Sequence, residues 1–152
     1  YYASSKEIYE NDKFFEFSSK TNQNKKEKYV NIKVNSLEDS LIIDGSSYKG
    51  KADMESIVGT WWNHEIVKSK SQISAISGRI IKQTVTFVGK EEVNLNGKTY
   101  NTLRFNFKSS DTSLSNNKKL NTDIWYDEKT FLWVKAAFDK TGYWEYRLKT
   151  YK

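Results

Sequence analysis

The segment VNLNGKTYNTLRFNF, residues 93–107, decides the fold class of this chain. Asn96 and Gly97 lie at its centre, between two runs in which apolar and polar residues alternate. Both residue types tolerate the positive φ angles of a type I′ turn, which joins two antiparallel strands through only two residues. The segment therefore predicts a tight β-hairpin.

The same alternation returns along most of the chain. Residues 99–108 place their apolar side chains on one face of a strand and their polar ones on the other, and residues 28–34 do the same. A two-residue period of this kind is typical of half-buried antiparallel strands. Turn residues separate such runs, and they predict turns at the following positions: 20–26, Asp44-Gly45, 127–130 and 139–142. The last thirty residues are thus expected to form a three-stranded meander.

One segment departs from this pattern. Between Met54 and Ser77 the apolar residues do not alternate, and spacings of four and five favour a short helix or an irregular crossing segment. A strongly twisted sheet must curl, and such a segment is suited to fill its open end. We therefore expect an all-β chain: a strongly curved antiparallel sheet or half-open barrel in one domain, residues 1–152, with one short helix or irregular crossing segment.

Composition narrows the classes of function. The chain has 152 residues, no Cys, a single His and a formal charge of +6 at pH 7. Disulfide frameworks, thiolate nucleophiles and multi-histidine metal sites are excluded, so we expect no metal and no cofactor. Arg79, Arg104 and Arg147 are the only arginines. Because nucleic-acid readers depend on arginine, no nucleic-acid partner is expected.

Two groups of residues invite a catalytic interpretation. His64 and Glu65 resemble a general base with its orienting carboxylate, but adjacent residues of a strand point to opposite faces. The carboxylates that glycoside hydrolysis would use fall mostly at turns or at a strand start: Asp123, Asp127, Asp139 and Glu145. We expect a histidine that packs or faces solvent, and a chain that is not an enzyme.

Aromatic residues carry the most information about function. They make up 15% of the chain. The simplest explanation for this high content is that a small core needs large side chains to be filled. The alternative is that some of them wall a groove for a lipid-like or amphipathic ligand on a concave sheet face. The four residues expected to bind it are Trp61, Trp62, Trp125 and Trp144. A structural or assembly subunit of a cell-envelope complex, with aromatics and sheet edges covered by a protein partner, is the other candidate.

Seven short motifs resemble an uncharacterised family of exported bacterial proteins. One of them is the five-residue run Gly59-Thr60-Trp61-Trp62-Asn63. The others are Lys6-Glu7-Ile8-Tyr9, Thr21-Asn22 within 14–24, Ile43-Asp44-Gly45, Ser77-Gly78, Trp125-Tyr126-Asp127 and Gly142-Tyr143-Trp144-Glu145-Tyr146. The resemblance implies an all-β fold, similar in outline to the half-open barrels of periplasmic lipoprotein carriers. It also implies a periplasmic or secreted protein whose signal peptide has been removed, and one that lacks an N-terminal hairpin. It transfers no catalytic residue.

No run of apolar residues is long enough to cross a membrane as a helix. The longest, such as Leu41-Ile42-Ile43, fall far short of the roughly eighteen residues required. We therefore expect no transmembrane segment within these 152 residues.

Overall fold

The computed structural model describes residues 2–139 and 142–149, and these form two compact units. The first comprises residues 1–60 and 71–81, and the second comprises residues 61–70 and 82–152. Strands make up 64% of the chain and helix 3%, which confirms the all-β class predicted from the alternation. The prediction of a single domain stays a prediction.

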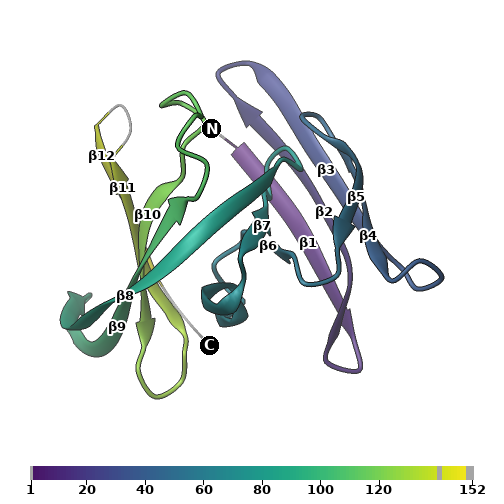
Figure 1. The fold of residues 1–152 in the computed structure, drawn as a ribbon. Coiled ribbons are helices and arrows are strands. Elements are labelled where there is room, and N and C mark those ends of the chain that lie inside the picture. Colours follow the sequence, from purple (N-terminus) through teal and green to yellow (C-terminus); the bar gives the residue numbers. More distant parts are fainter. Residues whose placement is uncertain (1, 140–141, 150–152) are drawn as a thin grey trace. The chain divides into compact units, whose positions relative to one another are not determined.

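The first unit is built on a five-stranded antiparallel meander, whose strands lie side by side in chain order (Figure 1). These strands are β1 (Tyr2–Glu10), β2 (Lys13–Gln23), β3 (Lys26–Asn35), β4 (Ser40–Gly45) and β5 (Lys49–Asp53). Two short strands, β6 (Ile57–Val58) and β7 (Ser71–Ile73), pair in parallel in the same unit. The apolar faces of the strands form its core: Phe17, Val30, Ile32, Leu41, Ile43, Ala52, Val58 and Ile73.

The second unit contains a strongly curled antiparallel sheet and a short 3-10 helix, η1 (His64–Lys68). Its strands are β8 (Ile80–Leu95), whose first two residues belong to the first unit, β9 (Lys98–Ser109), β10 (Asn121–Asp127), β11 (Trp133–Asp139) and β12 (Tyr143–Arg147). Each pairs with the next in the chain. The predicted C-terminal meander is therefore confirmed as β10, β11 and β12.

The deciding hairpin forms as predicted. Leu95 pairs with Lys98, so Asn96 and Gly97 alone make the turn, with φ angles of +51° and +77°. Two consecutive positive φ angles are the signature of the type I′ turn. After it, Phe107 is completely buried and Lys108 is exposed, which confirms the predicted dry and wet faces at this end of the strand.

The prediction of a turn at Asp44-Gly45 is wrong. Both residues end strand β4, where Asp44 pairs with Lys49, and the chain turns only afterwards, at residues 46–48. Gly45 is required for space instead of for turn geometry, because a Cβ atom there would lie 2.4 Å from the backbone oxygen of Ser77. The glycine marks a close approach of two backbone segments within the first unit.

The turns predicted within 20–26 and at 127–130 are both present. Within 20–26 the turn is confined to Asn24 and Lys25, which have φ angles of +53° and +62°. Asp127 closes its turn by accepting hydrogen bonds from the backbone N–H groups of Lys129 and Thr130. The turn predicted at 139–142 includes residues 140 and 141, which lie outside the described residues.

The crossing segment 54–77 is irregular, as expected, with η1 as its short helix.

Candidate functional site

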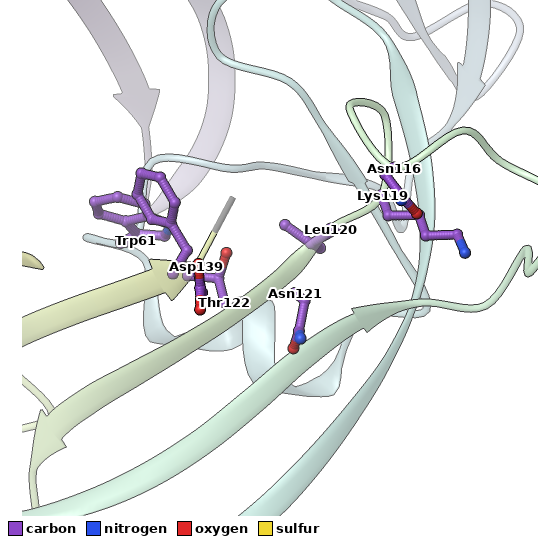
Figure 2. A pocket seen from close by; sticks show the side chains of 8 residues that line it. Trp61, Asn116, Lys119, Leu120, Asn121, Thr122 and Asp139 are labelled. Atoms are coloured by element: carbon purple, nitrogen blue, oxygen red, sulfur yellow. The ribbon is translucent and has the colours of Figure 1, made fainter. Parts of the chain in front are cut away.

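The second unit has a hollow of about 430 Å³ beside Trp61, which we call the Trp61 hollow. Three of its lining residues are apolar and five are polar: Trp61, Leu120, Phe138, Asn116, Lys119, Asn121, Thr122 and Asp139. Trp61 stands at one end, and Asn116 and Lys119 stand at the other (Figure 2). The volume falls within the range of roughly 300–1,000 Å³ that is typical of small-molecule sites.

The backbone of Trp61 adopts a rare conformation. Its φ angle is +68°, in the left-handed region that residues with bulky side chains seldom occupy. This conformation costs such a residue about 1–2 kcal/mol. A hydrogen bond holds it there, because the hydroxyl of the fully buried Tyr126 donates to the carbonyl oxygen of Trp61 at 2.8 Å. Burial raises the pKa of Tyr126, so this hydroxyl remains a donor at every physiological pH. Strain of this kind is concentrated at functional sites.

Neighbouring rings fix the indole of Trp61. It stacks on Trp133, with ring centroids 5.8 Å apart and planes inclined by 23°, and it meets Tyr146 at 5.7 Å. Tyr146 in turn stacks on Phe138 at 5.9 Å. Such pairs contribute about 0.5–1.5 kcal/mol each beyond the area they bury. The Trp61 hollow therefore has an aromatic wall that is positioned before any ligand arrives.

The opposite end of the hollow is set by the base of the loop between β9 and β10. Ser109 and Leu120 are joined by two bonds: the backbone N–H of Ser109 donates to the oxygen of Leu120, and the N–H of Leu120 donates to the Ser109 hydroxyl. Leu120 thereby lines the hollow, with Lys119 directly before it. The loop also turns back on itself, since the N–H groups of Lys118 and Lys119 both donate to Ser115.

The structure brings Trp62 close to Trp61 but outside the hollow. Trp62 is 58% exposed and lies edge-on to Trp133, with ring centroids 5.3 Å apart. Trp144 is 52% exposed on the same face of the sheet as Phe138, its partner across β11 and β12. Of the four tryptophans predicted to bind a ligand, Trp61 alone lines the hollow.

The expectation that Trp125 shares this face is corrected by the register of β10. Tyr126 faces the ring cluster, so Trp125 points to the other side of the sheet, where it is only 3% exposed. Its ring lies between Arg104 and Lys135, whose charged groups are 4.8 and 4.1 Å from the ring centroid. Its indole N–H donates to Glu91 at 2.8 Å. We call Trp125, Arg104, Lys135 and Glu91 the Trp125 clamp. Buried in this way, the Trp125 ring has no free face for a ligand.

Charged residues extend the Trp125 clamp across the sheet. Arg104 donates to Glu91 at 2.8 Å and also pairs with Asp123. The bond from Trp125, together with Arg104, lowers the pKa of Glu91. Glu145, next to Lys135, accepts hydrogen bonds from Tyr143 and Arg147. The carboxylates considered for hydrolysis are therefore mostly used in structural bonds.

Asn63 and His64 take structural positions. The Asn63 side chain accepts a hydrogen bond from the N–H of Glu65 at 3.1 Å, so it caps η1. His64 stacks on Phe131, with ring centroids 5.0 Å apart, and lies 3.3 Å from the carboxylate of Glu65. Neither residue borders the Trp61 hollow.

Nearly the whole chain matches a known protein family. Residues 1–149 match the family described as Domain of unknown function (DUF6134). The chain belongs to this family. Its resemblance to an uncharacterised all-β family is thereby confirmed. No curated protein and no solved structure was found to match.

Several residues of the site in this DUF6134 member escaped prediction. The local sequence does not single out Tyr126, because alternation alone leaves open whether Tyr126 or its neighbour Trp125 faces the binding side. Leu120 and Thr122 follow a polar loop that carries no motif. Only the pairing of β10 with β11, which sets Thr122 opposite Phe138, brings them to the Trp61 hollow.

Within 2–139 and 142–149 there is no group of three His, Asp or Glu side chains placed to hold a metal ion. In the same part of the chain, no helix has the length and apolar character needed to cross a membrane.

Proposed function

We propose that this chain is an exported, non-enzymatic binding protein that takes an amphipathic small molecule into the Trp61 hollow. One observation carries the proposal: the strained, ring-stacked Trp61 forms one end of a hollow whose other lining is largely polar. An indole held in advance offers apolar contact without the entropy loss of ordering it at binding. The apolar part of the ligand lies against Trp61, and its polar part faces Thr122 and Lys119.

Binding without chemistry is supported by the groups that line the hollow. Among the described residues that line it, Lys119 and Asp139 are the only charged ones, and there is neither a histidine nor a second carboxylate. Glycoside hydrolysis uses a pair of carboxylates, and acyl transfer uses a nucleophile with an adjacent base. Export is supported by the resemblance to exported bacterial proteins, and the absence of cysteine is compatible with it.

Titration with n-dodecyl maltoside below its micelle concentration tests the proposal, because this probe combines an alkyl chain with a polar head. We expect saturable binding to the wild-type chain with one site, measured by calorimetry. Trp61→Ala should weaken binding at least about tenfold. Trp62→Ala is the matched control, since it removes an adjacent, exposed tryptophan that does not border the hollow. Equal effects of both variants, or no binding, would contradict the proposal.

A second candidate function is an assembly subunit, and the edge strand β12 favours it. Tyr143, Trp144 and Tyr146 are 66%, 52% and 43% exposed on this strand. Exposed aromatic residues at a sheet edge are suited to pairing with a partner strand. Sedimentation of the purified chain distinguishes the two candidates, because a defined oligomer that dissociates in Trp144→Lys would support the subunit.

A further inference from the structure

We infer that the ligand of the Trp61 hollow is a saccharide, an inference that rests on the proposed function and specifies its ligand. The structure places a fixed indole and several polar side chains around one hollow, beside the apolar residues Leu120 and Phe138. A pyranose ring has the matching form, with C–H groups on one face and hydroxyl groups around its rim.

The aromatic end of the hollow suits the face of a sugar ring. Trp61 is held by Trp133, Tyr146 and the hydrogen bond from Tyr126, so its indole keeps its orientation. The negative π-face of an aromatic ring attracts weakly positive C–H groups. A flat, rigid contact of this kind favours a ring over a flexible chain, which loses more conformational entropy when it is ordered.

The polar lining decides against an alkyl chain. Within the described residues, the side chains of Asn116, Thr122 and Asp139 have no hydrogen-bond partner. Methylene groups placed over these side chains would displace their bound water without forming new hydrogen bonds. Each polar group left in this way weakens binding. Hydroxyl groups both donate and accept, so they can satisfy the Asp139 carboxylate, the Thr122 hydroxyl and the Asn116 amide together.

Asn121 borders the hollow but does not belong to this polar set. Its side-chain oxygen accepts a hydrogen bond from Asn106 on β9 at 3.0 Å. In Figure 2 its side chain leaves β10 on the opposite side from Leu120 and Thr122. Because its side chain is already bonded on that side, Asn121 is not chosen for substitution.

Charge points to a neutral saccharide. The described part of the lining contains one positive residue, Lys119, and one negative residue, Asp139, so neither sign is in excess there. Lys119 contributes, after Ser113 and Lys82, to lowering the pKa of Asp111. Among the described lining residues, a phosphate-rich or polyanionic ligand would find one cation.

NMR titration of the indole N–H signals tests the inference, with the Trp61 signal assigned from its loss in Trp61→Phe. The probes are maltotetraose, cellotetraose and chitotetraose, with dodecanoate as the chain without a sugar. We expect at least one tetrasaccharide to shift the Trp61 signal saturably at millimolar concentration and to compete with dodecyl maltoside. Dodecanoate should do neither.

Two substitutions locate the binding to the polar lining. Thr122→Val preserves the shape of the side chain and removes its hydroxyl, and Asp139→Asn removes the charge. Each should weaken the responding tetrasaccharide about fivefold to tenfold, while Trp62→Ala should leave its affinity unchanged. The unchanged dispersion of the remaining indole signals shows that each variant is folded.

The outcomes separate the two proposals. If dodecyl maltoside binds and is displaced by dodecanoate but by no saccharide, the saccharide inference is overturned and the amphipathic binding function stands. If no probe binds, dodecyl maltoside included, both are overturned. A saccharide that binds equally well to Thr122→Val and Asp139→Asn would also overturn the inference, because it would bind elsewhere.

Discussion

The hydroxyl of Tyr126 donates a 2.8 Å hydrogen bond to the backbone oxygen of Trp61, sixty-five positions earlier in the chain. This bond connects β10, the first strand of the C-terminal meander, to the segment that precedes η1. It holds a bulky residue at a φ of +68° and so fixes the aromatic wall of the Trp61 hollow. The geometry of the site thus depends on one buried side chain that does not border it.

Removal of this bond is the first test. We expect Tyr126→Phe to lower the free energy of unfolding by about 1–2 kcal/mol, because a carbonyl loses its partner. The Trp61 indole signal should also broaden or shift. Tyr146→Phe is the control, since Tyr146 is 43% exposed and its ring contacts survive the change. Urea unfolding checks both, and equal stability of the two variants would refute the role of the bond.

Two glycines should differ in what an added methyl group costs. In Gly45→Ala the new Cβ would lie 2.4 Å from the backbone oxygen of Ser77, so we expect a loss of at least about 2 kcal/mol. In Gly97→Ala the Cβ meets nothing within 4 Å, and only the φ of +77° is strained. That change should cost about 1 kcal/mol. Denaturant midpoints measure both, and the reverse order would contradict the close approach at Gly45.

Acid should weaken the Trp125 clamp. The hydrogen bond from Trp125, then Arg104, lowers the pKa of Glu91 below its ordinary value of 4.5. A carboxylate with a depressed folded-state pKa stabilises the fold fully above its unfolded pKa, and this stabilisation is lost as the pH falls through the folded pKa. The difference in stability between wild type and Glu91→Gln should therefore be constant near neutral pH and should shrink below pH 4.5. A difference independent of pH would show that Glu91 is not held this way.

Trp125 should matter for stability and not for binding. Trp125→Phe loses the indole hydrogen bond to Glu91 and part of a ring that is only 3% exposed, so we expect a loss of about 1–3 kcal/mol. Its affinity for dodecyl maltoside should equal that of the wild type, because the ring faces away from the Trp61 hollow. Calorimetry measures the affinity and urea unfolding measures the stability. A weakened affinity in a folded variant would contradict the proposed site, because it would place the ligand on the Trp125 face of the sheet.

Much of the fold was predictable because strand chemistry is local. The two-residue alternation in 99–108 and the turn at Asn96-Gly97 each depend on neighbours in the chain. Their outcome did not require knowledge of any distant residue. The error at Asp44-Gly45 has the opposite cause, since the need for a glycine arises from Ser77, thirty-two positions away.

The all-β class, the high aromatic content and the membership of an uncharacterised family all follow from the order of the residues. Which aromatic residues share a site depends on how the strands pair. Side chains alternate between the faces of a strand, so a shift of one residue in register would exchange Trp125 and Tyr126. The pairing of β10 with β9 and β11 fixes that register, and it sends Trp125 to the Trp125 clamp and Tyr126 to Trp61. That choice depends on contacts between distant segments, which no local pattern encodes.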